Sequence, residues 1–456
     1  MSALNESVKR AGSSERPAGL PPDNIAGSDF GWQSRPEGLD TGGAGQMPQG
    51  IVDGPARGAG GARSVEGRLL AHLLEHLGNP PVEFILWTGE HIAPAGAAII
   101  ARVRVSSRAT LLGILADPQV RFPDAYSEGR VEIEGDLVRL MEEVYHSGRR
   151  SPQPSALRRL VERLHRPHVN TLSGSRENIH HHYDIGNDFY SLWLGQTMAY
   201  TCAYYPTPAT TLDAAQTAKM DHVCRKLRLR AGESVLEAGC GWGTLAVHMA
   251  SHYGVKVRAF NISREQVAFA RARAASLGLS SQVEYVEDDY RNASGRYDAF
   301  VSVGMLEHVG VANYTALGQV IARSIGTHGR GLIHSIGRNF PAALQPWIEK
   351  RIFPGACPPS LAQMMQIFEP YDFSVLDVEN LRLHYARTLH DWLALFEAAS
   401  GRVREMFDEK FVRMWRMYLA GSIAGFTTGA LQLFQVVFAP RDNNDVPMTR
   451  EHLYVR

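Results

Sequence analysis

The sequence predicts an α/β protein in which a large Rossmann-like domain follows a small α+β domain and an N-terminal tail. Three observations support this fold class. Strand and helix patterns alternate after residue 230, a glycine-rich turn follows the first of these strands, and 456 residues with 44% hydrophobic content can fill more than one core. We therefore expect a tail at 1–62, a small domain at 63–148, a basic linker at 149–177 and a large domain at 178–456.

The N-terminal tail is rich in Gly, Pro, Ser and Asp and poor in aliphatic residues. Such a segment cannot bury enough apolar surface to offset its ordering entropy, so we expect residues 1–62 to be disordered. From residue 63 the pattern becomes globular. Its periodicity predicts helices at 65–77 and 136–145 and strands at 83–88 and 98–105.

The connector at 149–168 is strongly basic, with six arginines and one acid, Glu162. On a helix several of these arginines would share a face, where anionic headgroups are attracted by about 1 kcal/mol per basic residue. A solvated linker helix explains the same pattern, and both interpretations stay open. The six are Arg149, Arg150, Arg158, Arg159, Arg163 and Arg166.

The large domain alternates strands and helices in the order expected of a parallel sheet. Ligands of such sheets bind in the crevice at the carboxyl ends of the strands. The predicted strands are 235–238, 255–260, 283–286, 299–303 and 331–336, with helices at 264–275 and 313–325.

The turn after the first strand reads E-x-G-x-G-x-G over residues 237–243. Glycines let the backbone approach a ligand without a Cβ in the way, and the following helix presents free N–H groups. A dinucleotide site would carry an acid at the end of the next strand, but that strand ends in Asn261. An acid on the first strand instead favours S-adenosylmethionine (SAM), with NAD or a plain tight turn as the alternatives.

Composition limits the partners. Lys+Arg and Asp+Glu both number 47, so bulk charge gives no support for nucleic acid. No C-x-x-C pair occurs among Cys202, Cys224, Cys240 and Cys357, and no signal peptide is visible, which favours a reduced cytosol. The uncharged segment 417–439 is interrupted by glycines and polar residues, so we expect a core helix followed by a strand at 431–438 rather than a membrane span.

Six further motifs carry a family resemblance. With the glycine-rich turn they form an ordered series that resembles the cyclopropane-fatty-acyl-phospholipid synthase family, which includes the mycolic acid cyclopropane synthases, over 178–438. The motifs are residues 182–190 (HYDIGNDFY), 198–204 (MAYTCAY), 304–310 (GMLEHVG), 334–337 (HSIG), 352–355 (IFPG) and 384–389 (HYARTL).

The resemblance implies a SAM-dependent catalytic domain that acts on cis-monounsaturated acyl chains of membrane phospholipids. It also implies a homodimer associated peripherally with the inner face of the membrane in the cytoplasm. An alkene is a poor nucleophile, so it must be held about 3 to 3.5 Å from the methyl group in an apolar slot. Aromatic faces can stabilise the resulting carbocation, which water would destroy. Loss of a proton from the new methyl then closes the ring.

The resemblance implies that the base is a bound bicarbonate held by Cys202, Glu307, His334, the backbone of Ile336, and Tyr385. Each residue alone also has a purely structural interpretation, such as a helix cap for Glu307 or a core histidine for His334. The positions matched to SAM contacts are Tyr200, Thr201, Val235, Leu236, Glu237, Ala238, Gly239, Cys240, Gly241, Trp242, Gly243, Asn261, Ile262, Ser263, Arg264, Glu265, Gln266, Tyr290 and Arg291.

Three positions depart from the family pattern. Glu237 stands in place of the usual aspartate, Asn261 in place of threonine, and Ser422 where relatives often carry a cysteine. A serine without an evident base there argues against a covalent enzyme intermediate. Adjacent histidines at 180–182 point in different directions on a helix, so we expect no metal. Two alternatives stay open: a SAM-dependent fatty-acyl C-methyltransferase that makes methylene- or methyl-branched chains, and an inactive SAM-binding regulatory protein.

Overall fold

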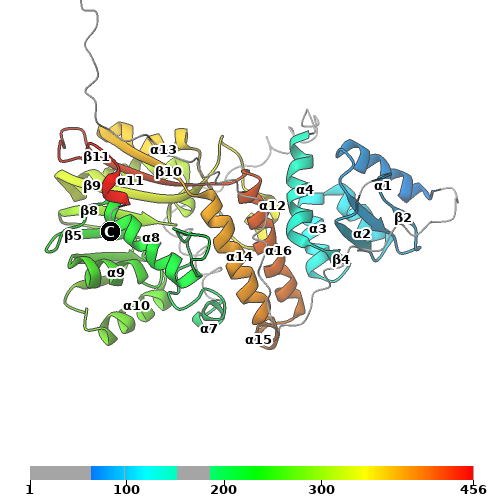
Figure 1. The fold of residues 1–456 in the computed structure, drawn as a ribbon, viewed down its shortest axis with the longest axis horizontal. Helices are drawn as coiled ribbons and strands as arrows, with labels where there is room; N and C mark the ends of the chain where they lie inside the picture. The colour runs from blue at the N-terminus through cyan, green and yellow to red at the C-terminus, as the bar shows by residue number, and fades with distance from the viewer. Residues whose placement is uncertain (1–62, 97, 151–184, 455–456) are drawn as a thin grey trace, which may run out of the picture. The chain divides into compact units, whose positions relative to one another are not determined.

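A computed structural model describes residues 63–96, 98–150 and 185–454. The predicted tail, the basic connector from residue 151 on, and the histidines at 180–182 lie outside the described residues. Within the described part, two separate sheets organise the chain (Figure 1). The expected mixed α/β fold with a Rossmann-like sheet is confirmed.

The first sheet has four strands in the order β2-β1-β3-β4, with β1 parallel to β3 and the other pairs antiparallel. Its core is built from alternate residues of β3 that are fully buried, among them Ala101 and Val103. The elements are α1 (Val65–His76), β1 (Val82–Ile85), β2 (His91–Ile92), β3 (Ala101–Val105), α2 (Arg108–Ala116), α3 (Pro118–Ser127), β4 (Val131–Gly135) and α4 (Leu137–Arg150).

Periodicity did not predict α2, α3 or β4. Helix α3 contains an internal proline, Pro123, which normally argues against a helix. Its start is nevertheless well formed, because Asp117 caps the helix by accepting from the Val120 amide and Pro118 occupies the first turn. Capping and the burial of residues 123–127 together outweigh the propensity against helix here.

The second sheet has seven strands in the order β10-β11-β9-β8-β5-β6-β7. Strands β5 to β9 are parallel, and β11 and β10 extend the edge in antiparallel fashion. The chain leaves β5 toward β6 and β7 on one side and later returns to β8 and β9 on the other. The switch point where ligands bind in such sheets is therefore the crevice between β5 and β8.

Six strands of this sheet agree with the predicted ones to within a few residues at most ends, except that β9 begins earlier; β10 was not predicted. The seven strands are β5 (Ser234–Ala238), β6 (Lys256–Asn261), β7 (Val283–Glu287), β8 (Tyr297–Val303), β9 (Ile325–Gly337), β10 (Phe373–Asn380) and β11 (Gln432–Pro440). The helices are α7 (Asn187–Ser191), α8 (Leu212–Lys226), α9 (Thr244–Tyr253), α10 (Arg264–Ser276), α11 (Tyr314–Ser324), α12 (Pro346–Arg351), α13 (Leu361–Phe368), α14 (Arg382–Ala398), α15 (Ser400–Met406) and α16 (Glu409–Thr427).

Each face of the seven-stranded sheet has its own apolar core. Helices α8, α9 and α10 pack on one face through residues such as Val223 and Ala270, and α11 and α13 pack on the other through residues such as Ile321 and Ile367 (Figure 1). Short 3-10 turns at Tyr290–Asn292 and Leu306–His308 follow β7 and β8 at the carboxyl edge. Predicted site residues lie on both turns.

Helices α14 and α16 lie side by side and carry a third, largely aromatic core (Figure 1). The predicted core helix and last strand at 417–439 are confirmed as the end of α16 and β11.

Contacts also join α16 and α12 to the four-stranded part: the Arg413 guanidinium lies 4.3 Å from the Tyr126 ring centroid, and Trp347 donates to Asp124 at 2.9 Å. None of the described helices is both long and apolar enough to cross a membrane.

Candidate active site

The glycine-rich turn leaves β5 at the switch point of the sheet. Gly239, Gly241 and Gly243 all have positive φ, a backbone conformation that residues other than glycine rarely adopt. The amides of Gly239 and Cys240 donate to the Phe260 carbonyl at 2.9 and 3.1 Å, which fixes the turn against β6. The turn therefore depends on the backbone conformations of its glycines and is held in place by hydrogen bonds to β6.

The glycines of this turn differ in what surrounds them. A Cβ on Gly239 would meet the Met305 Cβ at 2.7 Å, so the turn packs directly against the loop after β8. A Cβ on Gly241 would meet nothing within 4 Å. The space above Gly241 is where a cofactor would approach the backbone, so the turn fits SAM.

Glu237, at the end of β5, is almost completely buried, and its Oε2 has no hydrogen-bond partner among the described residues. Burial raises the pKa of this carboxyl to about 8, against the opposing field of Lys219. A buried acid with an open oxygen next to a glycine turn suits the ammonium or hydroxyl groups of SAM. Lys219, which sequence reasoning missed, donates from Nζ to Thr201 Oγ1 at 2.8 Å.

Asn261 ends β6 and connects the turn to the next helix. Its Nδ2 donates to the Gly241 carbonyl at 3.2 Å and to Gln266 Oε1 at 2.8 Å. Ser263 caps α10 by accepting from the Gln266 amide at 3.4 Å. Asn261, Ser263 and Gln266 are thus brought together with the glycine turn.

Tyr290 and Arg291 lie on the 3-10 turn after β7. The Arg291 side chain makes a bidentate pair with the buried Asp289, with both contacts at 2.8 Å. Burial raises the pKa of the Tyr290 hydroxyl, so the ring stays neutral. Since Asp289 engages the Arg291 guanidinium, we expect Arg291 to shape this edge of the site rather than to act as an unpaired cation.

Glu307 occupies the 3-10 turn after β8 and is buried. Its Oε1 accepts from the Ile336 amide at 2.6 Å, while Oε2 has no partner among the described residues. Burial raises the pKa of the carboxyl to about 7 even though hydrogen bonds lower it. A carboxyl that readily keeps a proton can lie beside a small anion and donate to it, so this position fits bicarbonate.

His334 lies near the carboxyl end of β9 and is paired across the ladder with Gln435 of β11. The two side chains meet at 3.0 Å between His334 Nδ1 and Gln435 Nε2. Burial and the nearby Lys219 and Lys226 lower the pKa of His334 well below its ordinary value, so the imidazole is neutral. Gln435 therefore orients a neutral histidine, a role that no motif indicated.

Cys202 is fully buried, and burial raises the pKa of its thiol, which stays protonated. Its Sγ lies 3.1 Å from the Ala203 carbonyl oxygen and 3.9 Å from that of Leu381, one helical turn before Tyr385. The Ala203 amide donates to Thr388 Oγ1 at 3.0 Å. Helix α14 thus holds the Cys202 segment in place and brings Tyr385 to the same region.

An aromatic cluster borders this region. Tyr200 is within 5.5 Å, centroid to centroid, of Tyr190, Trp193 and Trp392, and its hydroxyl lies 2.9 Å from that of Tyr418. Phe353 links Tyr418 to His308, the neighbour of Glu307. Such ring faces exclude water and stabilise positive charge.

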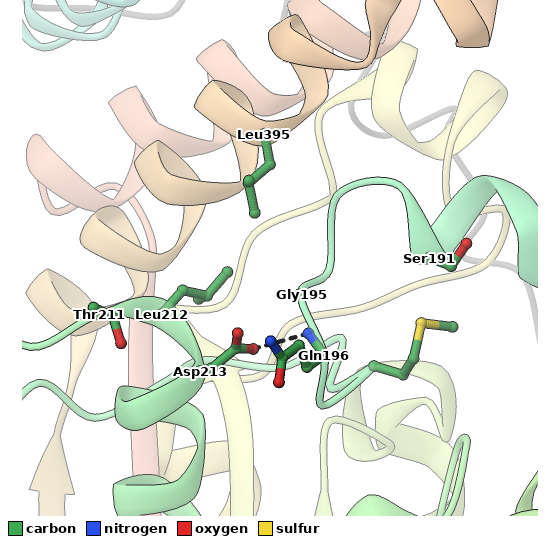
Figure 2. Close-up of a pocket in the computed structure, with 8 residues that line it drawn as sticks. Ser191, Gly195, Gln196, Thr211, Leu212, Asp213 and Leu395 are labelled. Carbon is green, nitrogen blue, oxygen red and sulfur yellow. Dashed lines mark hydrogen bonds between the residues drawn. The ribbon is translucent and has the colours of Figure 1, made fainter. Parts of the chain in front are cut away.

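An open cavity of about 540 Å³ lies at the start of α8 (Figure 2). In it Asp213 accepts from the Gln196 amide at 2.9 Å, and Met198, Leu212 and Leu395 supply apolar walls. None of the predicted site residues lines this cavity. The chemistry of the site therefore rests on the carboxyl edge of the sheet and not on this hollow.

The sheet order, the glycine turn at the switch point and the acid before it define a SAM-dependent methyltransferase domain. Residues 171–436 match the family described as Mycolic acid cyclopropane synthetase, which is more than half of the sequence. The chain belongs to this family and is an enzyme of the SAM-dependent methyltransferase class.

Relatives cover much of the chain. A "Probable fatty acid methyltransferase" of Pseudomonas putida is 36% identical over 393 residues, which is 82% of this chain and 96% of the relative. The cyclopropane-fatty-acyl-phospholipid synthase of Escherichia coli (strain K12) is 40% identical over 270 residues, 59% of this chain and 69% of the relative. The cyclopropane synthase MmaA2 from Mycobacterium tuberculosis has a TM-score of 0.56 at 26% identity, covering 58% of this chain and 98% of that one.

Proposed function

We propose that the enzyme transfers a methylene group from SAM to the cis double bond of unsaturated phospholipid acyl chains, making cyclopropane fatty acids. The observation that carries the proposal is the buried Glu307 carboxyl, anchored through one oxygen by Ile336 and open at the other. Ring closure requires a protected proton acceptor, whereas methyl branching by reduction of the cation does not. The E. coli relative named as a cyclopropane-fatty-acyl-phospholipid synthase supports the same function.

The cofactor side of the site serves the first step. SAM supplies an electrophilic methyl group when bound. Glu237 and the backbone of the glycine turn would hold it, with Asn261 fixing the carbonyl of Gly241. The aromatic cluster around Tyr200 keeps water away from the acyl chain and offers ring faces to positive charge that develops on it.

The anion side of the site serves proton removal. Bicarbonate would supply the base, held by Cys202, Glu307, His334 and Tyr385. A Glu307 carboxyl with a pKa of about 7 can share a proton with the anion, and the neutral His334 can donate to it. Because the Ile336 amide already donates to Glu307, we propose that Ile336 positions this glutamate rather than binding the anion through its N–H.

A second function has specific support. The Pseudomonas putida relative that covers most of this chain is named as a probable fatty acid methyltransferase. In that function a 1,2-hydride shift would move the cation to the methyl-bearing carbon, and loss of a proton from the new methyl would give a methylene-branched chain. Alternatively, a partner that donates hydride would reduce the cation to a methyl-branched chain. The two functions share the fold, SAM and the first step, and differ only in the product.

The product distinguishes them. Purified protein would be incubated with vesicles of cis-monounsaturated phospholipid and SAM carrying a fully deuterated methyl, and the lipids analysed by mass spectrometry. A chain that gains CD2 and survives mild hydrogenation supports ring closure. A hydrogenatable methylene product, or CD3 retained when a reductant is supplied, assigns branching instead. Vesicles of saturated phospholipid are the matched control and should gain no label.

We also propose that the enzyme works as a homodimer at the inner face of the cytoplasmic membrane. Exposed apolar side chains on the described helices, such as Val65 and Leu69 on α1 and Leu112 on α2, could contact a lipid surface. Cosedimentation with phospholipid vesicles and light scattering test the two parts separately. Protein that stays in the supernatant, or a monomer mass, would contradict the respective part.

A further inference from the structure

Lys219 lies on the buried face of α8, one turn after Ala215 and one turn before Val223, and is only 3% exposed. Burying an ammonium group costs free energy unless it is paired and hydrogen-bonded. Its Nζ donates a hydrogen bond to a neutral hydroxyl, Thr201 Oγ1, at 2.8 Å. This lysine therefore lacks, among the described residues, an acceptor that carries a full negative charge within 4.0 Å.

Glu237 presents the complementary situation. It is 2% exposed, and its Oε2 has no partner among the described residues. Lys219 and Glu237 influence each other's pKa, since the lysine lowers that of the acid and the acid raises that of the lysine, but they do not approach within 4.0 Å. The site thus holds a buried base and a buried acid that are close enough to influence each other's pKa but do not form an ion pair.

An α-amino acid fits between two such groups, because it carries an ammonium and a carboxylate on one carbon. Thr201 strengthens this match. Its hydroxyl oxygen accepts from Lys219, which leaves its O–H available as a donor. Lys219 and Thr201 together would offer two donors to one carboxylate, while Glu237 would accept from an ammonium.

We propose that Lys219 is a further SAM-binding residue that takes the carboxylate of the methionine moiety, opposite Glu237, which takes its ammonium group. The proposal rests on SAM being the cofactor and is independent of the lipid product. It also gives Thr201 a defined role, as the hydroxyl that links Lys219 to the same carboxylate.

The test compares two ligands that differ only in the carboxylate. Isothermal calorimetry would measure binding of S-adenosylhomocysteine and of its analogue without the carboxylate, the 3-aminopropyl thioether of adenosine, to the full chain. Charge-assisted hydrogen bonds predict that the wild type prefers S-adenosylhomocysteine by roughly 10- to 100-fold. In Lys219→Met this preference should fall to about 3-fold or less, and in Thr201→Val to an intermediate value.

Comparing two ligands on one variant cancels any general loosening of the fold. Lys226→Met is the matched control, since Lys226 is a buried lysine on the same helix whose Nζ donates to Glu379 at 2.6 Å. It should keep the wild-type preference.

Two results would overturn the proposal. One is equal affinity of the wild type for both ligands, which requires no variant. The other is an undiminished preference for S-adenosylhomocysteine in Lys219→Met, or in Lys219→Gln if Lys219→Met does not fold. If the wild type binds neither ligand, SAM itself fails as the cofactor and the proposed function falls with it.

Discussion

The backbone amide of Ile336 donates to Oε1 of Glu307 at 2.6 Å, across from β9 to the turn after β8. The Cys357 amide donates to the carbonyl of the same glutamate at 2.7 Å. Glu307 is therefore fixed at its side chain and its backbone by neutral donors. Its position does not depend on a counter-ion, so a bound ligand can change the protonation state of the Glu307 carboxyl without breaking an ion pair.

Replacing Glu307 by glutamine should separate chemistry from cofactor binding. Glutamine keeps an oxygen for the Ile336 amide but can neither accept nor share a proton. We expect turnover to fall by roughly 10²- to 10⁴-fold while affinity for S-adenosylhomocysteine changes little. Rates come from mass spectrometry of the lipid product and affinities from calorimetry. Glu405→Gln, at a side chain 69% exposed, is the control; a wild-type rate in Glu307→Gln would refute the base-holding role.

The raised pKa of Glu307 also predicts how stability depends on pH. The folded protein keeps a proton until about pH 7, whereas the unfolded chain releases it near the ordinary value of 4.5. The free energy of unfolding should therefore fall as pH rises through this window, by up to about 3 kcal/mol, and change no further from this group above pH 7. Thermal midpoints between pH 5 and 7.5 should fall less steeply in Glu307→Gln than in the wild type or Glu405→Gln. Parallel curves would mean that Glu307 titrates near its ordinary pKa.

Gly241 tests the cofactor turn. A valine there would project into the open space above the turn, so we expect binding of S-adenosylhomocysteine to be lost. Its φ of +52° also imposes backbone strain of about 1 to 2 kcal/mol on a side chain. Gly232, with φ +87° and an equally open Cβ position, reproduces the strain in the turn before β5. Gly232→Val should lower the melting temperature but keep affinity, and unchanged binding in Gly241→Val would refute the assignment of the turn.

Much of the fold was predictable because short stretches of sequence determine its helices and strands. Alternating strand and helix patterns and the glycine turn gave the parallel strands, and buried runs gave the last strand. Helix α3, which contains Pro118 and Pro123, was missed because its stability comes from the Asp117 cap and tertiary burial, which periodicity does not record.

The site was predictable only where motifs name its residues. The Glu307 contact with Ile336 joins residues 29 apart, and the His334 contact with Gln435 joins residues 101 apart, so sheet register decides both. Lys219 did leave a sequence signal that went unused, since a lysine between Ala215 and Val223 at four-residue spacing falls on the apolar face of a helix. Residues whose partners are set by topology could not be found without the strand order.

Gln435 offers a final test, because it lies directly opposite His334 on β11 and is fully buried. A carboxylate in its place would stabilise the imidazolium form and raise the pKa of His334, which burial now holds well below its ordinary value. In Gln435→Glu we expect His334 to become protonated near neutral pH, and turnover to fall roughly 10-fold or more because an imidazolium would lower the basicity of the proposed anion beside it. NMR of ¹³C-labelled histidine side chains follows the titration. Gln432→Glu is the control, since Gln432 lies on the same strand but opposite Gly337, where it contacts Asn380; it should leave His334 neutral. A His334 that stays neutral in Gln435→Glu would show that Gln435 does not govern its protonation.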